Sequence, residues 1–281
     1  MILIADSGST KTDLRLWNPL NNDVYSYSSK GLNPYFVSSG EISSVVASTL
    51  PIEFIDKISH IYFYGSGCSS PDSKKIILDG LQNACSQARL EVNHDLMGAA
   101  RALLGSEAGV ACILGTGSNA CYYDGKEIVE EGVSYGYVMG DEGSGNHLGR
   151  LLLKSVFSHK APHEIQLAFK EQFPELDLPA LLRQIYHLPS PNKFLASFSP
   201  FILNHRKNDF IKGIIHESFT KFFEEFVAGL ARDKNDKIGF QGSIAHFYKD
   251  EIIELFREKG LNPVSFLDKP IEKLLIYHQT Q

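Results

Sequence analysis

The chain has 281 residues, of which 43% are hydrophobic and 11% aromatic, enough for one large or two ordinary domains with a buried core. Its formal net charge of −6 argues against a protein that binds nucleic acid or an anionic membrane, because no basic excess exists to neutralise phosphates. No apolar run approaches the ~18 residues of a membrane span, and no signal-peptide pattern opens the chain, so we expect a cytoplasmic protein.

The chain has four cysteines. None of them belongs to a C-x-x-C pair or to a Cys/His cluster with zinc spacing. Two lie in apolar segments that are typical of strands. We therefore expect buried, reduced thiols at Cys68, Cys85, Cys112 and Cys121.

Residues 2–12, ILIADSGSTKT, join an apolar strand to a turn of small and hydroxylated residues. Gly8 lets a ligand approach the main chain closely, and successive N–H groups of such a turn can surround a phosphate oxygen. The side chains that could help them are those of Ser9, Thr10 and Lys11. Asp6, at the end of the strand, is placed to hold a hydrated magnesium ion. Taken alone, the stretch fits a plain hairpin turn with a stray acid equally well.

The remainder of the first half alternates strands and helices. We expect strands over residues 13–17, 24–28, 58–64 and 90–93. We expect helices over residues 41–50, 73–88 and 96–104, the second with apolar positions at helical spacing. The GLNP segment at 31–34 forms a loop, because its proline interrupts a helix or a ladder. A Gly-Ser-Gly turn at 65–67 closes the strand before it, and the strand at 90–93 leads to Asp95.

The opening pattern then recurs about a hundred residues later. An apolar strand over 109–114 runs into a second turn of glycine and hydroxyl residues, which consists of Gly115, Thr116, Gly117, Ser118 and Asn119. Strands over 120–123 and 127–130 follow, joined by an Asp-Gly hairpin signal at 124–125. Two halves that each begin with a phosphate-type turn predict a duplicated architecture with a cleft between them. The recurrence favours nucleotide binding over two isolated hairpins.

Residues 132–145, GVSYGYVMGDEGSG, contain five glycines and two adjacent acids. Ordering such a segment costs chain entropy without packing in return, which favours a binding role. A helix is expected at 146–157, and mostly helical structure from 162 to 232. There Phe219, Phe222, Phe223, Phe226 and Leu230 form an aromatic stripe that we assign to the core. His159 and His163 are expected at the surface and not as metal ligands. A strand at 238–241, a helix at 244–259, a strand at 263–266 and a helix at 270–278 end the sequence.

Three glycine turns, each leaving a strand, therefore stand in order: DSGSTKTD from Asp6, LGTGSNA from Leu114 and FQGSIA from Phe240. This order resembles the phosphate-1, phosphate-2 and adenosine signatures of the sugar-kinase, Hsp70 and actin superfamily. The segments NHDLMGAARALLG, ILGTGSNA and GYVMGDEGSG resemble the N-acetylglucosamine kinase branch of the BadF/BadG-type ATPase family. The resemblance covers essentially the whole chain.

The resemblance implies an α/β fold of two ribonuclease-H-like (actin-like ATPase) domains with a central cleft. We expect an N-terminal domain over residues 1–106 and a C-terminal domain over 107–281. The last helix is a candidate to pack back on the N-terminal domain. The implied activity is ATP-dependent phosphorylation of an amino sugar with Mg²⁺, giving the 6-phosphate of N-acetylglucosamine, and a homodimer is common in the branch.

The same resemblance implies a role for each matching residue. Asp6 would anchor magnesium through water, the turns at 8–11 and 115–118 would face the phosphates of ATP, and the Gly242-Ser243 pair would border the adenosine. Asn33 and Asp141 would contact the sugar, with the ring of Tyr135 beside it. Asp95 would take the proton from the sugar hydroxyl, which is general-base catalysis. A helix N-cap is the structural alternative for this aspartate, and Glu142 could equally orient the glycine loop from outside the site.

One departure from the branch bears on the substrate. Residues 132–135 are Gly-Val-Ser-Tyr, where the branch usually has glycines and a tryptophan. The sugar pocket could therefore differ in shape, and glucosamine or N-acetylmuramic acid stay open beside N-acetylglucosamine. Two other functions also stay open: an activator ATPase that serves a dehydratase through an iron–sulfur cluster, and a non-catalytic sugar-sensing protein on the same fold.

Overall fold

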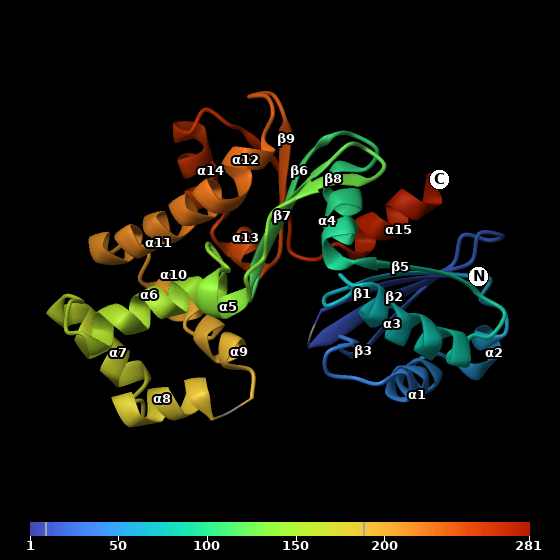
Figure 1. Ribbon diagram of the computed structural model, residues 1–281, viewed down its shortest axis with the longest axis horizontal. Helices are drawn as coiled ribbons and strands as arrows, with labels where there is room; N and C mark the ends of the chain where they lie inside the picture. Colours follow the sequence, from blue (N-terminus) through green and yellow to red (C-terminus); the bar gives the residue numbers. More distant parts are fainter. Residues whose placement is uncertain (9, 188) are drawn as a thin grey trace. The chain divides into compact units, whose positions relative to one another are not determined.

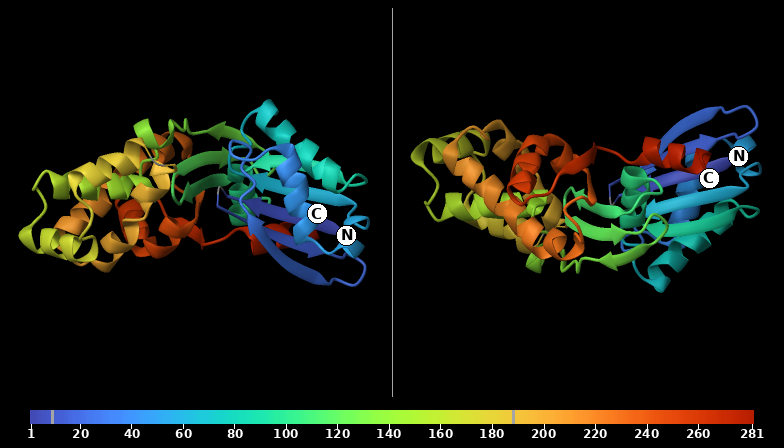
Figure 2. Two further views of the ribbon diagram at one scale, coloured as in Figure 1. Left: turned by 90° about the horizontal axis from the view of Figure 1, so that it is seen from below. Right: turned by 90° about the horizontal axis from the view of Figure 1, so that it is seen from above.

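The computed structural model describes residues 1–8, 10–187 and 189–281. The chain divides into two compact units, which we call unit 1 (residues 1–106 and 269–281) and unit 2 (residues 107–268). Each unit is built on a five-stranded sheet with helices packed against it (Figure 1). Figure 2 shows each of the two sheets from two further directions.

The sheet of unit 1 has the strand order β3-β2-β1-β4-β5. Its strands are β1 (Ile2–Ser7), β2 (Lys11–Trp17), β3 (Val24–Lys30), β4 (His60–Gly65) and β5 (Arg89–His94). The first three form an antiparallel meander, and β4 and β5 run parallel to β1. The parallel strands β1, β4 and β5 therefore end at the same edge of the sheet.

The helices of unit 1 are α1 (Ser39–Thr49), α2 (Ile52–Ile55), α3 (Pro71–Ala84), α4 (Asp95–Leu104) and α15 (Ile271–Gln279). In Figure 1, α1 and α3 lie on one face of the sheet and α4 and α15 on the other. Capping boxes begin α1 at Ser38 and α3 at Ser70, which satisfies N–H groups that have no partner inside the helix. The closing helix α15 contacts α4, β1 and β2 and so belongs to unit 1.

The sheet of unit 2 repeats this order, as β10-β9-β6-β7-β8. Its strands are β6 (Gly109–Leu114), β7 (Ser118–Tyr123), β8 (Ile128–Glu131), β9 (Lys237–Gln241) and β10 (Pro263–Leu267). Again the first three are antiparallel and the last two are parallel to the first. The duplicated architecture that the recurring glycine turns predict is therefore confirmed at the level of strand order and direction.

Most of the helices of unit 2 form one long insertion between β8 and β9. They are α5 (Gly136–Met139), α6 (Gly145–Phe157), α7 (His163–Gln172), α8 (Leu178–Tyr186), α9 (Pro191–Ala196), α10 (Ser199–Asn204) and α11 (Asp209–Phe222), which continues through the π-helical turn η1 (Phe223–Val227) into α12 (Ala228–Leu230). Two more follow β9, namely α13 (Ser243–Phe247) and α14 (Lys249–Glu258). Within the described residues, none of the helices combines the length and the apolar composition of a membrane span.

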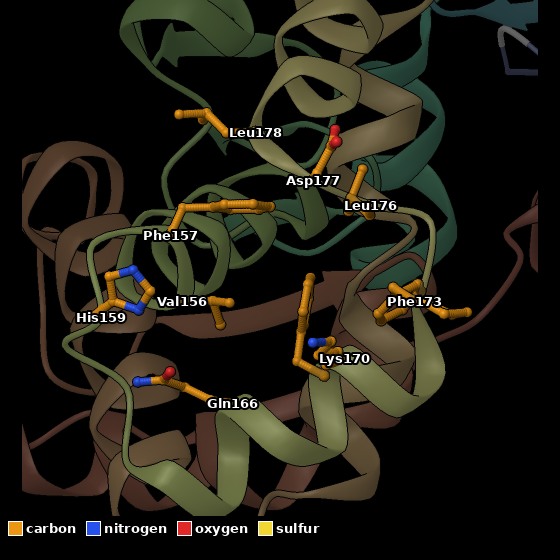
Figure 3. Close-up of a pocket in the computed structure, with 11 residues that line it drawn as sticks. Val156, Phe157, His159, Gln166, Lys170, Phe173, Leu176, Asp177 and Leu178 are labelled. Carbon is orange, nitrogen blue, oxygen red and sulfur yellow. The ribbon is translucent and has the colours of Figure 1, made fainter.

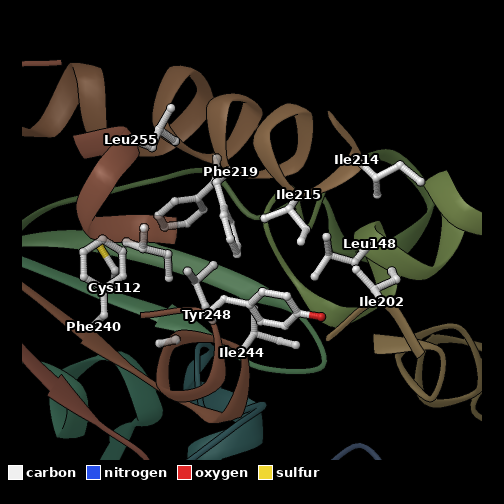
Figure 4. Packing of buried hydrophobic residues seen from close by; sticks show 14 of the residues in the cluster. Cys112, Leu148, Ile202, Ile214, Ile215, Phe219, Phe240, Ile244, Tyr248 and Leu255 are labelled. Carbon is white, nitrogen blue, oxygen red and sulfur yellow. The ribbon is translucent and has the colours of Figure 1, made fainter. Parts of the chain in front are cut away.

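The core of unit 2 lies where α11, α13 and α14 pack on the sheet. Figure 4 shows Phe219, Phe240 and Tyr248 converging there with aliphatic side chains from neighbouring helices. Burying each such side chain contributes roughly 1.5–3 kcal/mol. The predicted aromatic stripe is confirmed as core, with Phe223 partly buried at its margin. The predicted burial of the four cysteines is also confirmed.

The helix expected over residues 244–259 is instead two helices, α13 and α14. The break falls at Tyr248, whose φ of −109° and ψ of 26° leave the helical region. Its ring is buried, and its hydroxyl donates to the carbonyl of Ser199 at 2.8 Å, so that a tertiary contact decides the break. The helix expected to reach residue 88 ends at Ala84, and the glycine-rich segment contains the short helix α5, which the sequence does not predict.

Candidate functional site

The first glycine turn of unit 1 connects β1 to β2. The Gly8 N–H donates to the carbonyl of Lys11 at 2.9 Å, which closes the turn. Gly8, Thr10 and Lys11 are exposed, so the predicted phosphate-1 turn is accessible to a ligand. Ser9, which is also predicted to bind phosphate, lies outside the described residues. The ammonium group of Lys11 pairs with the carboxylate of Asp13.

A chain of hydrogen bonds fixes the neighbouring loop to this turn. The Leu32 N–H donates to Ser7 Oγ at 2.9 Å, Ser7 Oγ lies 2.8 Å from Thr12 Oγ1, and Thr12 donates to the carbonyl of Lys30 at 3.1 Å. Because Thr12 donates to Lys30, its oxygen is the acceptor for the Ser7 hydroxyl. The loop that carries Asn33 is thereby held against the end of β1.

Asn33 is buried, and its Oδ1 accepts the N–H of Tyr35 at 3.0 Å. A Cβ on Gly67 would lie 2.5 Å from this same Oδ1. Gly67 also has a φ of +83°, which favours glycine. The predicted sugar-contacting side chain is therefore enclosed between its own loop and the glycine turn after β4.

The three parallel strands of unit 1 bring the predicted acids to one edge. Ser7, Gly65 and His94 lie in one register row at the ends of β1, β4 and β5. Asp6 precedes the first of them, and Asp95 follows the last as the first residue of α4. Since these strands end together, both carboxylates lie at the same sheet edge as the glycine turn.

The carboxylate of Asp6 is in an unfavourable environment for a negative charge. Burial, followed by the negative charges of Asp95 and Asp13, raises its pKa to about 7. A divalent cation, which prefers carboxylate oxygens, would relieve this. Among the described residues, no group of three or more His, Cys, Asp and Glu side chains lies close enough to hold a metal directly.

Asp95 stands in the first turn of α4, where the N-terminal end of the helix favours a negative charge. The N-cap position belongs to His94, so the N-cap alternative for Asp95 is wrong. Asp95 is partly exposed. Its charge also contributes to the raised pKa of Cys68, after burial, which places the carboxylate near the Gly65–Cys68 turn.

A buried polar network connects α4 to the closing helix. Arg101 Nη1 donates to the Tyr64 hydroxyl and to Glu91 Oε1, both at 2.6 Å, and the Tyr64 hydroxyl lies 2.8 Å from His278 Nε2. Because Arg101 is a donor, the tyrosine proton points to His278, which accepts it as a neutral imidazole. Burial, then the charge of Arg101, lowers the pKa of His278 to about 4. The helix that presents Asp95 is thus bonded to the end of the chain.

Unit 2 brings the second and third glycine turns together. The Gly115 N–H donates to the carbonyl of Gly117 at 2.9 Å, closing the predicted phosphate-2 turn. Gly242, with a φ of +113°, lies so close that a Cβ there would be 2.4 Å from the carbonyl oxygen of Leu114. Ser243 then begins α13. The predicted phosphate-2 and adenosine residues are therefore neighbours in unit 2.

The GDEGSG segment lies against the same turn. The Asn146 amide donates to Asp141 Oδ2 at 2.8 Å, and the Ser118 hydroxyl donates to the carbonyl of Glu142 at 2.7 Å. Asp141 is buried, and burial is the largest cause of its raised pKa. Glu142 thus supports the turn through its backbone carbonyl.

Two residues of α6 that sequence reasoning missed organise this segment. Arg150 donates to the carbonyls of Tyr137, Val138 and Gly140. His147 Nδ1 accepts the N–H of Gly143 at 3.2 Å, so its proton is on Nε2. Both are polar positions in a helix whose buried positions are mostly apolar, directly after a glycine-rich segment, and this pattern was the available sequence signal.

Tyr135 lies just before α5 and is 62% exposed. The structure thus places the predicted site residues in two sets. Unit 1 carries the magnesium, sugar and base candidates Asp6, Asn33 and Asp95 with the first turn. Unit 2 carries the other two turns with Asp141 and Tyr135.

A cavity of about 400 Å³ lies elsewhere in unit 2, at the far end of α6 (Figure 3). Its walls come from α6, α7 and the segment that leads into α8, and they include Phe157, Phe169 and Phe173, with Lys170 and Asp177 beside them. The start of α6 at the phosphate-2 turn is about 16 Å away along the helix. We do not assign the nucleotide to this cavity, because its lining contains none of the glycine turns.

Comparisons with known proteins were made by sequence and by structure. No model of a protein family matches the chain, and no protein with a curated description does either. Among solved structures, a protein of Porphyromonas gingivalis provisionally named as an N-acetylglucosamine kinase is 36% identical, with a TM-score of 0.93, over 100% of this chain and 99% of that one.

Two further structures share the fold at low identity. A provisionally named N-acetylglucosamine kinase of Chromobacterium violaceum is 17% identical, with a TM-score of 0.75, over 98% of each chain. A provisionally named N-acetylmannosamine kinase of Listeria monocytogenes is 12% identical, with a TM-score of 0.53, over 99% of each chain. The predicted fold class, α/β with two ribonuclease-H-like units, is confirmed. Since the first structure matches over the whole length at 36% identity, the chain belongs to the N-acetylglucosamine kinase branch of the BadF/BadG-type ATPase family and is an ATP-dependent sugar kinase.

Proposed function

We propose that the chain transfers the terminal phosphoryl group of ATP to the 6-hydroxyl of N-acetylglucosamine. The observation that carries this proposal is the sheet edge of unit 1, where Asp95 stands beside Asp6 and the first glycine turn. The provisional name of the Porphyromonas gingivalis protein supports an amino sugar as acceptor. Glucosamine and N-acetylmuramic acid are the alternative acceptors, because residues 132–135 depart from the branch.

In this proposal Asp95 is the general base. Its carboxylate accepts the proton of the sugar hydroxyl as the oxygen attacks the phosphorus atom. Phosphoryl transfer needs mainly positioning and charge neutralisation. Besides these, the protein would therefore supply only one chemical group, the base that accepts the hydroxyl proton. Asn33, enclosed by Tyr35 and Gly67, and the exposed Tyr135 would orient the sugar.

The nucleotide would be held by the glycine turns. The backbone N–H groups of residues 8–11 and 115–118 would face its phosphates, and Gly242 and Ser243 would border its adenosine. Asp6 would hold Mg²⁺ through water, and the ion, when bound, neutralises charge on the transferring phosphates.

The test is ADP release across a panel of amino sugars by the parent enzyme and by Asp95→Asn. N-acetylglucosamine should give the highest kcat/KM, and the variant should lose a factor of roughly 10²–10⁴ in kcat while still binding sugar. A variant as fast as the parent would remove Asp95 as the base. If no sugar raises ADP release above background, the proposed function fails.

Two other functions receive less support. An activator ATPase needs cysteines that hold an iron–sulfur cluster at a subunit interface, whereas Cys112 and Cys121 are fully buried in adjacent strands. A sugar sensor has no need of a base such as Asp95. Anaerobically purified protein should therefore contain no iron. The homodimer and the cytoplasmic location remain predictions.

A further inference from the structure

The two faces of the unit 1 sheet are filled differently. The face beneath α1 and α3 carries apolar side chains that belong to the core. Because side chains alternate along a strand, the residues between them point to the other face, beneath α4 and α15. On β4 and β5 these residues, which pair with one another in register, are Tyr62, Tyr64, Glu91 and Asn93. The helix that carries Asp95 therefore covers a polar part of the sheet.

One face of α4 lies along the side chain of Tyr64. Asp95, Gly98 and Arg101 follow one another at intervals of three, which makes them neighbours on the helix surface. A Cβ on Gly98 would be only 3.0 Å from the Cβ of Tyr64, and Arg101 donates to the hydroxyl of the same tyrosine at 2.6 Å. The helix face that begins at Asp95 is thus placed by both ends of one side chain.

The closing helix holds Tyr64 in turn. The tyrosine is fully buried, and its hydroxyl lies 2.8 Å from Nε2 of His278, which accepts its proton. The imidazole ring stacks on Tyr62 with 3.8 Å between the ring centroids. With Arg101 as its donor and His278 as its acceptor, the hydroxyl has a defined orientation. The position of α15 therefore determines where Arg101 and its helix lie.

Stability alone does not explain this arrangement. The guanidinium of Arg101 also donates to Glu91 at 2.6 Å, but its Nε is buried and has no hydrogen-bond partner within the described residues. A buried charge is costly, and an unpaired nitrogen adds to the cost. What a buried polar network does provide is a restriction of its members to one arrangement.

We propose that Arg101, Tyr64 and His278 form a network that positions the catalytic base. The network fixes the placement of α4 on the sheet, and with it the direction in which Asp95 presents its carboxylate. Tyr64 and His278 are buried and act as positioning residues. The inference rests on the proposed function, because it takes Asp95 to be the base. A base must lie within hydrogen-bond reach of its proton, so a small shift of α4 lowers the rate and leaves sugar binding intact.

The test measures kcat with N-acetylglucosamine and ATP, and the affinity for the sugar by calorimetry. Tyr64→Phe and His278→Leu, which both remove the hydroxyl–imidazole bond, should each lower kcat about tenfold or more. Sugar affinity should stay within about twofold. His278→Gln should keep most of the parent's kcat, because its amide oxygen can accept the tyrosine proton.

A double-mutant cycle shows whether the effect passes through the base. If Tyr64 acts by placing Asp95, then Tyr64→Phe should cause no further loss of kcat in an Asp95→Asn background. A tyrosine that merely stabilises the fold would lower the rate of both backgrounds by the same factor.

Tyr248→Phe is the matched control. Tyr248 of unit 2 is likewise buried, and its hydroxyl donates to the carbonyl of Ser199 at 2.8 Å. Its substitution removes a buried hydroxyl as Tyr64→Phe does, so it should cost similar stability and leave kcat unchanged. If His278→Leu does not fold, Tyr64→Phe decides, since both remove the same hydrogen bond.

Three results would overturn the positioning role. One is a Tyr64→Phe enzyme as fast as the parent, and another is an equal loss of kcat in the parent and Asp95→Asn backgrounds. The third is an equal loss in His278→Gln and His278→Leu. The parent and Asp95→Asn test the proposed function separately. If the parent shows no sugar-dependent ADP release, or if Asp95→Asn is as fast as the parent, that function or its base fails first, and the positioning role fails with it.

Discussion

The two units have the same strand order, but they support their glycine turns in different ways. In unit 1 the turn lies over two strand hydroxyls, Ser7 and Thr12, and the nearby acid Asp6 is left in a repulsive, buried setting. In unit 2 the turn lies on the start of α6, and the nearby acid Asp141 is hydrogen-bonded. The same strand order therefore supports two different environments. The turn of unit 1 has a poorly stabilised carboxylate beside it, whereas the turn of unit 2 has its backbone held by hydrogen bonds.

Asp6→Asn tests the charged side of this contrast and should have the largest effect. If Asp6 holds Mg²⁺ as proposed, loss of its carboxylate should lower kcat on the order of 10²–10³-fold. The same variant should stabilise the ligand-free protein, because an ordinary Asp pKa of 3.8 is raised to about 7 in the fold. That shift corresponds to at most about 4 kcal/mol at neutral pH and above. Denaturant unfolding at pH 8 measures it, and an Asp6→Asn protein less stable than the parent would contradict the interpretation.

Gly242→Ala tests how closely the turns of unit 2 approach each other. A methyl group there would lie 2.4 Å from a backbone oxygen at a φ of +113°, so we expect a loss on the order of 2–4 kcal/mol and weaker ADP binding. Gly105→Ala is the control, because its φ is +64° and its Cβ position has open space. It should cost about 1–2 kcal/mol from backbone strain alone. Equal losses in the two variants would show that close approach is unimportant.

Asp141→Asn should change stability less than Asp6→Asn. Burial raises the pKa of Asp141 as well, but hydrogen bonds from Asn146 and from the Ser118 N–H oppose that shift. The asparagine oxygen can still accept from Asn146, whereas its NH2 group cannot accept from the Ser118 N–H. We expect a change within about 1 kcal/mol in thermal or denaturant unfolding. If Asp141→Asn stabilises the protein as much as Asp6→Asn does, the two acids are in equivalent environments and the contrast between the units is wrong.

One histidine in each unit should contribute a loss of stability on acidification, in opposition to Asp6, whose raised pKa stabilises the fold as pH falls. Burial lowers the pKa of His278 in unit 1 and of His147 in unit 2 to about 4, against an ordinary value of 6.5. The unfolded chain therefore binds more protons between these values, so stability is complete above pH 6.5 and is lost as pH falls toward 4. At a pH of about 5 the loss should be about 1–2 kcal/mol for each histidine. His278→Gln and His147→Gln should each remove one of these losses, which the difference in unfolding free energy between variant and parent at pH values from about 7 to about 4 measures.

Local chemistry made much of the fold predictable. The strand over residues 109–114 has the predicted bounds, because an apolar run that ends in glycine is a local signal. The break at Tyr248 was not predictable, since it depends on a contact with Ser199 that is distant in sequence. The role of Asp95 stays a prediction, but its place at a sheet edge follows from the strand–helix boundary beside it.

The residues that hold the candidate site in place were harder to predict from the sequence. Arg150 and His147 act through carbonyl and N–H groups of the glycine-rich segment, and such partners leave no residue-type signature. The same holds for Asp141: its sequence context indicates a binding segment, whereas only the coordinates show its bond to Asn146. A side chain that binds a backbone group can be recognised only from the geometry of the folded chain. Every residue has the same backbone groups, so the sequence does not show which of them is the partner.

Unit 1 is discontinuous in sequence, because its last helix follows the whole of unit 2. During synthesis, unit 2 is therefore complete before unit 1 can acquire α15 and close the Tyr64–His278 bond. The helix that carries Asp95 gains its final support only when the segment beyond residue 268 leaves the ribosome. A nascent chain that stalls earlier would contain a complete unit 2 and a unit 1 that still lacks its last helix.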